Sequence, residues 1–222
     1  MKKAFTLAEV LITLVVIGIV AAITINIIFN NQEEAYKSCL KKSFSVLQQA
    51  FRKATIDNGG FFPVGYGEDP NQNIIKIGDA IFKSNMKVVK DCYKDTCFWE
   101  GEQKISNYNG TTIYTTYKSN YVYKSSVILQ DGTFFQIDSY SKLGTDPTYS
   151  YIYVLVDVNG LYKGPNRLGK DVFYLEYDVR NEKLNPHAEN LANMDICSKS
   201  STDRKNGIGC ADLIRRGQKL PW

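Results

Sequence analysis

The side chains that could do chemistry in this 222-residue chain are few, and they fall into small groups. One group is a set of five cysteines, another is a short run of Asp, Asn and Gly, and the last is a lone carboxylate in an apolar N-terminal stretch. The chain has a single histidine, His187, which excludes a His-rich metal site and leaves little basis for a Ser-His-Asp triad. Because no nucleophile with its base stands out, we do not expect an enzyme.

The cysteines favour disulfides if the polypeptide is exported from the cytoplasm. Cys92 and Cys97 are close enough in sequence for a small local bridge, and a bridge between Cys197 and Cys210 would close a Ser-rich C-terminal loop. Cys39 is left over, and the sequence alone leaves open that it pairs with one of the other four. A zinc site is not expected, since paired Cys-x-x-Cys spacing is missing and the one histidine stands alone.

A second set of side chains offers oxygen ligands. Asp157 and Asn159 stand at alternate positions ahead of Gly160, with Asp171 downstream. This arrangement resembles the start of a calcium loop, so Asp157, Asn159 and Asp171 are the candidate ligands. The same residue types form turns for backbone reasons alone, and the bidentate Glu of a calcium loop is missing at the expected spacing. We therefore favour a turn, expect no cofactor, and keep calcium as the alternative.

Glu9 is the carboxylate in the apolar stretch. Before residue 30 the only charged side chains are Lys2, Lys3 and Glu9, and residues 10–25 are apolar on every helical face. With its flanks this run approaches the ~20 residues that a membrane-spanning helix needs. The two lysines would keep the N-terminus in the cytoplasm and place the later residues outside. A carboxylate in such a helix is costly, so we expect a partner for it.

A secretory signal peptide is the competing interpretation of this stretch, with a basic start and a small-residue cleavage site near Ala22. The apolar run is long for a signal peptide, and Glu9 interrupts its beginning. The two interpretations differ in the mature protein. A cut before Phe5 keeps the apolar helix, whereas a cut near Ala22 discards it.

The run AFTLAE at residues 4–9, after a two-lysine leader, resembles the cleavage and methylation motif of type IV pilins and type II secretion pseudopilins. The resemblance implies that a prepilin peptidase cuts between Ala4 and Phe5 and methylates the new amine of Phe5. Glu9 then becomes the fifth mature residue and an assembly residue, whose charge pairs with the amine of a neighbouring subunit. Residue 4 is usually Gly in this family and is Ala here.

The resemblance implies a structural subunit of a type IV pilus or type II secretion pseudopilus. Its partners would be homologous pilin subunits, the prepilin peptidase, the assembly ATPase and the inner-membrane platform, with membrane lipid before assembly. The net charge of +4 is too mild to suggest nucleic acid as a partner. The location would be the bacterial inner membrane, as a single-pass protein with a cytoplasmic N-terminus and an exported head, and then a filament.

Two other functions are consistent with the same residues. One alternative is a minor pilin whose head binds DNA, a surface or an exported substrate. Another is a secreted or membrane-anchored binding protein or enzyme that carries an ordinary secretion signal or anchor. Pilus and pseudopilus are not distinguished by the residues.

The elements that position these groups begin with the N-terminal helix. Beyond residue 30 the pattern becomes amphipathic and ends at Asn58-Gly59-Gly60, so a straight helix is expected from about Thr6 to Asp57, ~75 Å long. The parts are then a leader (1–4), a transmembrane and assembly half (5–29), an amphipathic half (30–58) and a β-rich head (59–222) with a disulfide-bounded C-terminal region. The apolar stripe of the amphipathic half consists of Tyr36, Leu40, Phe44, Leu47, Phe51 and Ala54.

The head is predicted to be rich in strands. Strand composition appears at residues 113–117, 121–123, 151–157 and 172–177, and Asp131-Gly132 predicts a hairpin within residues 127–137. A short helix is predicted over 77–84 and a short strand over 86–89. Since the connections are short, the sheet should be antiparallel. The fold class is therefore α+β, with a long N-terminal helix packed on an antiparallel sheet in a pilin-like layout.

Overall fold

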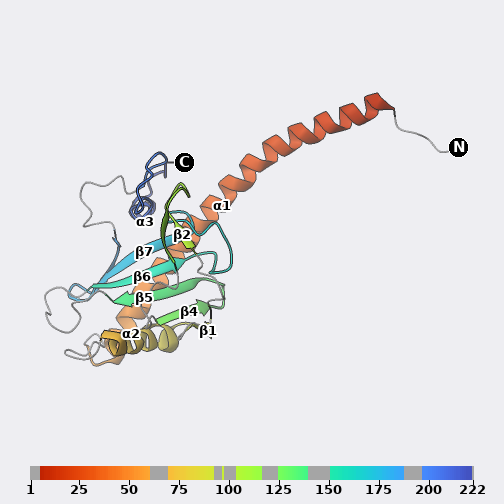
Figure 1. The fold of residues 1–222 in the computed structure, drawn as a ribbon. Coiled ribbons are helices and arrows are strands. Elements are labelled where there is room, and N and C mark those ends of the chain that lie inside the picture. Colours follow the sequence, from red (N-terminus) through yellow and green to blue (C-terminus); the bar gives the residue numbers. More distant parts are fainter. Residues whose placement is uncertain are drawn as a thin grey trace.

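One long helix dominates the molecule (Figure 1). The computed structural model describes residues 6–60, 70–92, 97, 104–116, 125–139, 151–187 and 197–221. Helix α1 (Leu7–Asp57) begins after the N-cap Thr6 and ends at the C-cap Asn58. Gly59 follows with φ of 76°, a left-handed conformation that glycine adopts without strain. The predicted bounds of the long helix are thus confirmed.

Six strands form one antiparallel sheet in the order β1-β4-β5-β6-β7-β8. The antiparallel prediction is confirmed, and β4 and β5 form the hairpin predicted at Asp131-Gly132, where Gly132 has φ of 88°. The strands are β1 (Val88–Asp91), β4 (Ser125–Leu129), β5 (Phe134–Ser139), β6 (Tyr151–Asp157), β7 (Val172–Asp178) and β8 (Lys183–Pro186).

Smaller elements complete the described part of the head. Strands β2 (Lys104–Ser106) and β3 (Ile113–Thr116) form a two-stranded sheet. The helix predicted over 77–84 begins earlier, as α2 (Pro70–Gly78), and continues as the π-helical turn η1 (Asp79–Lys83). A short helix, α3 (Cys210–Arg215), lies near the C-terminus. The strand predicted at 121–123 falls outside the described residues.

The main core lies between the large sheet and the helices. The apolar stripe of α1 supplies the fully buried Leu47 and Phe51, and the ring of Phe51 stacks on Tyr177 of β7 with centroids 4.0 Å apart. From η1, Phe82 stacks on Phe135 of β5 at 5.9 Å. The same stripe places Leu40 and Ala54 in this core, with Tyr36 and Phe44 packed at its margin.

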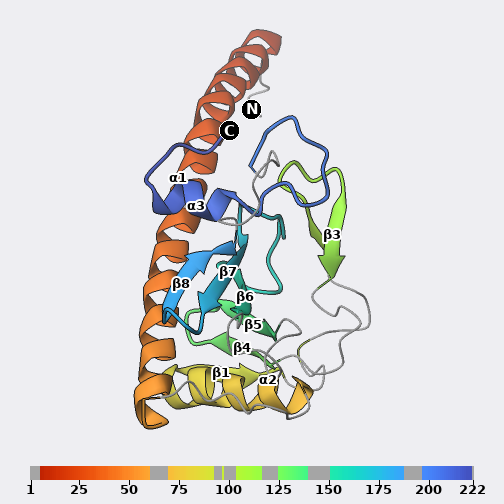
Figure 2. The ribbon, with the colours of Figure 1, turned by 90° about the vertical axis from the view of Figure 1, so that its left-hand side faces the viewer.

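A second core covers the opposite face of the sheet at one end. Side chains alternate between the two faces of a strand, so Phe134 belongs to this core while its neighbour Phe135 belongs to the main one. Figure 2 shows α2 and β1 at the far end of α1, whereas the C-terminal segment lies at the end where α1 leaves the head. The other residues of this core are Cys92, Cys97, Ile105, Leu155, Leu161, Leu168, Val172 and Ile208.

Candidate functional site

Thr6 and Glu9 close the N-terminal end of α1 by binding each other. The Thr6 N–H donates to Glu9 Oε2 at 2.8 Å, and the Thr6 hydroxyl donates to the same oxygen at 2.9 Å. In return the Glu9 N–H donates to Thr6 Oγ1 at 3.3 Å. This capping box satisfies donors that no helical carbonyl reaches. The Thr-x-x-Glu spacing is visible in the sequence and would have predicted it.

The apolar part of α1 has no cover from the rest of the described chain. Residues Leu7–Thr24 form a helix long and apolar enough to cross a membrane, and none of the 18 residues is buried. Thr13 and Thr24 donate their hydroxyls to the carbonyls of Val10 and Val20, at 2.8 and 2.9 Å. Such bonds remove the cost of a free hydroxyl in lipid. The segment therefore suits either lipid or the apolar faces of other helices.

Two polar contacts attach the head to α1 just beyond that segment. The Tyr36 hydroxyl accepts hydrogen bonds from Asn159 Nδ2 at 3.0 Å and from Gln32 Nε2 at 2.9 Å. Lys42 Nζ pairs with Asp131 Oδ2 at 2.7 Å. These contacts hold the β6–β7 loop and the β4–β5 turn against the helix. The Tyr36–Asn159 and Lys42–Asp131 contacts join residues far apart in sequence, so no local sequence pattern predicts them.

The predicted processing residues and the cysteines have different outcomes. Ala4 and Phe5 lie outside the described residues, so cleavage and methylation stay predictions. Disulfides join Cys92 to Cys97 and Cys197 to Cys210, the two pairs that the spacing suggested. Cys39 is a free thiol, partly buried on α1, so the alternative pairings left open above are not the ones formed.

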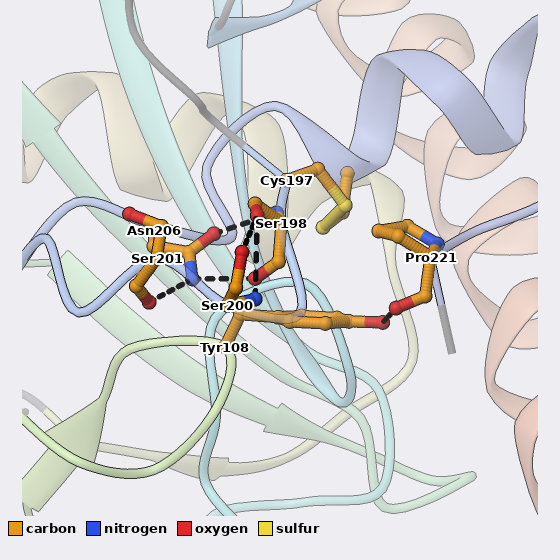
Figure 3. The surroundings of a disulfide bond; sticks show 8 residues. Tyr108, Cys197, Ser198, Ser200, Ser201, Asn206 and Pro221 are labelled. Carbon is orange, nitrogen blue, oxygen red and sulfur yellow. Dashed lines mark hydrogen bonds between the residues drawn. A yellow bond between two sulfur atoms is a disulfide. The ribbon is translucent and has the colours of Figure 1, made fainter.

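The loop closed by Cys197–Cys210 is organised around Asn206 (Figure 3). This side chain is 1% exposed, and its Oδ1 accepts a hydrogen bond from the Ser198 N–H at 2.9 Å. Its Nδ2 donates to the carbonyls of Ser198 and Ser201, both at 2.8 Å. The Asn206 carbonyl accepts from the Tyr108 N–H at 2.8 Å, and the Tyr108 hydroxyl reaches the Pro221 carbonyl at 3.4 Å.

Asn107 completes this connection from the other side. It is fully buried, and its Oδ1 accepts from the Thr111 and Thr112 N–H groups at 3.0 and 3.2 Å. Its Nδ2 donates to the carbonyls of Thr202 and Asp203 at 3.3 and 3.0 Å. The turn at 107–112 and the disulfide loop thus form one unit. Sequence reasoning missed both asparagines, because a single Asn in a polar loop has no periodic signal.

The candidate calcium ligands lie at the two ends of the β6–β7 loop, where the oxygens of Asp157 and Asp171 accept hydrogen bonds from backbone N–H groups. Asp157 Oδ1 accepts from the N–H groups of Asn159 and Gly160, at 3.2 and 2.9 Å. The two oxygens of Asp171 accept from the N–H groups of Asn166 and Arg167, both at 2.8 Å. Burial raises the pKa of Asp171 in spite of these bonds. Hydrogen bonds from backbone N–H groups to a nearby Asp side chain are typical of turns.

One observation still fits a cation at this loop. The side-chain oxygens of Asn159 and Asn166 are buried without a hydrogen-bond partner. Against it, the described part of the chain holds no group of three or more His, Cys, Asp and Glu side chains that could bind a metal. Calcium binding by Asp157, Asn159 and Asp171 stays a prediction, which the melting temperature in calcium and in a chelator would test.

Comparison with known proteins bears on the N-terminal helix. Residues 1–25 match the family model described as the prokaryotic N-terminal methylation motif. No curated protein and no solved structure matches the chain. The matched residues include Glu9 and the whole uncovered apolar segment Leu7–Thr24, and the α+β head behind them has a pilin-like layout. The chain therefore carries the prepilin-type N-terminal signal of type IV pilins and pseudopilins.

Proposed function

We propose that the chain is a structural subunit of a type IV pilus or a type II secretion pseudopilus. The observation that supports this most is the methylation motif at residues 1–25, which contains the membrane-length segment Leu7–Thr24 that no other part of the described chain covers. Prepilin peptidase would remove the leader (1–4) and methylate Phe5. The mature helix would then stay in the inner membrane, with the head exported, until the ATPase and platform move it into a filament.

Assembly follows from the charges at the start of the mature helix. A cut before Phe5 creates a positive amine one residue ahead of the capping pair of Thr6 and Glu9. In a low-dielectric surrounding an unpaired charge is expensive, so the amine of one subunit and the Glu9 carboxylate of another would neutralise each other. This pairing would set the axial position of each incoming subunit, while the apolar faces supply packing.

The head would follow the helix as a rigid unit. The amphipathic half of α1 (30–58) places Leu47 and Phe51 in the centre of the main core, where both are fully buried. Polymerisation through residues 5–29 would therefore display the whole head at the filament surface. Outside the cytoplasm, the disulfides at Cys92–Cys97 and Cys197–Cys210 are stable, which suits such an exposed part.

The intact mass of the protein purified from membranes tests the proposal. With the peptidase present, we expect the loss of residues 1–4 and the gain of one methyl group on the amine of Phe5. Without the peptidase, the full-length mass should remain. A mature N-terminus near Ala22 would instead show a secretory signal peptide, and the proposal would be wrong.

A further inference from the structure

Three basic side chains meet where α1 enters the head. Lys170 acts electrostatically on Glu33 of α1, and Arg167 and Lys199 in turn act on Lys170. Burial and, after it, the charge of Arg167 lower the pKa of Lys170. The carboxylate of Asp171, also close by, is fully buried and taken up by backbone N–H groups. Burial raises the pKa of Glu33, the positive charges of Lys170 and Lys37 lower it, and the neighbouring carboxylate of Glu34 raises it.

The fold holds these basic groups in place. The Lys170 ammonium lies 5.6 Å from the centroid of the Tyr108 ring, a cation–π contact. The Arg167 guanidinium lies directly against Gly110, where an added Cβ would come within 2.6 Å of it. Tyr108 and Gly110 belong to the turn that Asn107 joins to the C-terminal disulfide loop. The turn at 107–112 therefore helps to hold the positive charges of Lys170 and Arg167 close together.

The same end of the head carries more positive charge. Lys163 on the β6–β7 loop, and Arg204 and Lys205 on the C-terminal disulfide loop, are exposed, and Asp203 is the exposed acid on these two segments. Figure 2 shows both segments at the end where α1 leaves the head. We call these six groups the basic surface: Lys163, Arg167, Lys170, Lys199, Arg204 and Lys205.

The basic surface lies beside the part of α1 that would pass through the layer of lipid headgroups. If residues 5–29 span the bilayer, Glu33 lies four residues further, which is about 6 Å along a helix. The headgroup layer on each side of a bilayer is itself about 5–7 Å thick. Electrostatic attraction reaches about 8 Å further at physiological salt. With the helix placed in this way, Lys170 and its neighbours would lie at the height of the phosphates.

We propose that the basic surface binds the headgroups of anionic phospholipids in the outward leaflet while the subunit is stored in the membrane, an inference that rests on the proposed function. Guanidinium and ammonium groups bind phosphate oxygens by charge-assisted hydrogen bonds. Free phosphate and nucleic acid present similar oxygens. The basic surface adjoins the membrane-length helix, and this position favours lipid over either of them.

Lipid selectivity of the full chain tests this inference. The chain is reconstituted in phosphatidylcholine vesicles, and the association of spin-labelled phosphatidylglycerol is compared with that of spin-labelled phosphatidylcholine. Wild type should prefer phosphatidylglycerol. The variant Arg167→Gln/Lys170→Gln/Lys199→Gln should lower the preference about threefold or more, since each basic residue near a surface contributes to binding. In 1 M salt the wild-type preference should fall as well.

A charge-matched control lies at the far end of the head. Lys76→Gln/Lys87→Gln/Lys90→Gln removes an equal number of positive charges from exposed positions on or beside α2 and β1. This variant should keep the wild-type preference for phosphatidylglycerol. The single variant Lys199→Gln changes an exposed residue and should show a partial loss even if the triple variant folds poorly. Equal preference in wild type, both triple variants and the single variant would overturn the inference.

Further measurements distinguish lipid from other ligands, and distinguish a failure of the inference from a failure of the proposed function. Millimolar inorganic phosphate, compared with chloride of equal ionic strength, should leave the lipid preference unchanged, and its loss would overturn the inference in favour of free phosphate. Capture of a short DNA duplex without any lipid preference would also overturn it. Extraction with alkaline carbonate reports on anchoring. A released chain contradicts the proposed function, whereas a retained chain without lipid selectivity contradicts the inference alone.

Discussion

At the residue scale, Glu9 has one partner in the structure and another in the proposed filament. In the chain itself it accepts two hydrogen bonds from Thr6 and closes the helix end. In the filament its charge would meet the amine of Phe5 from another subunit. The first role needs oxygen acceptors, while the second needs a negative charge. Substitutions can therefore separate them.

We expect Glu9→Gln to insert in the membrane but to fail in assembly. Glutamine can still form a capping box with Thr6, but it has no charge for the neighbouring amine. Thr6→Ala is the matched control, because it removes the cap and keeps the carboxylate. Glu9→Val removes both the capping side chain and the negative charge, and it should also stay in the membrane unassembled. The measurement is the amount of subunit in sheared filaments relative to membranes, and normal incorporation of Glu9→Gln would contradict the charge-pairing mechanism.

Because Asp171 is buried, we expect the stability of the head to depend on pH. Burial raises its pKa above the usual 3.8, so the folded state holds the proton more tightly than the unfolded chain. Its stabilising contribution is complete below pH 3.8 and is lost as the pH rises through the folded pKa. The free energy of unfolding in detergent should therefore fall with rising pH more steeply in wild type than in Asp171→Asn. Parallel curves for the two proteins would contradict this prediction.

At the element scale, the C-terminal disulfide loop depends on Asn206 as well as on its covalent bond. Its buried side chain makes three hydrogen bonds to the backbone of the loop. Asn206→Ala should lower the free energy of unfolding by about 2–4 kcal/mol, since it leaves buried backbone groups without partners. Denaturant unfolding in detergent measures the loss. Ser200→Ala, at an exposed position of the same loop, should change stability by less than about 0.5 kcal/mol.

Elements differ in how well the sequence predicted them, and length and locality explain the difference. Helix α1 and the β4–β5 hairpin follow from patterns within one continuous segment, and both were found. Strands β2 and β8 and helix α3 are too short for a periodic signal and depend on contacts with distant segments. Helix α2 begins at Pro70, ahead of the predicted start, because proline suits the first turn of a helix.

The candidate site shows the same limit. Glu9 and the paired cysteines could be named because their neighbours in sequence define their chemistry. The Lys42–Asp131 ion pair and the Tyr36–Asn159 hydrogen bond join residues 89 and 123 positions apart. Only the folded chain brings such residues together. The basic surface was missed for the same reason, since its members come from two loops that become neighbours beside α1.

At the scale of the whole molecule, α1 is part of the head as well as its anchor. Besides placing Leu47 and Phe51 in the core, the helix binds the edge strand β8 through Gln48. The Gln48 Oε1 accepts a hydrogen bond from the Leu184 N–H at 2.8 Å, and the Gln48 Nε2 donates to the Glu182 carbonyl at 3.2 Å. An edge strand exposes unpaired backbone groups, and here the helix covers some of them.

The head should therefore need the amphipathic half of α1 in order to fold. A chain that begins at residue 31 keeps Leu47 and Phe51, and we expect it to melt cooperatively in water with both disulfides formed. A chain that begins at residue 59 lacks them. Losing one large core side chain costs about 2–5 kcal/mol, and a domain is stable by only about 5–15 kcal/mol. This shorter chain should show no cooperative melting by circular dichroism. A separate peptide of residues 31–58 should restore the transition, and cooperative melting without it would show that the head folds independently.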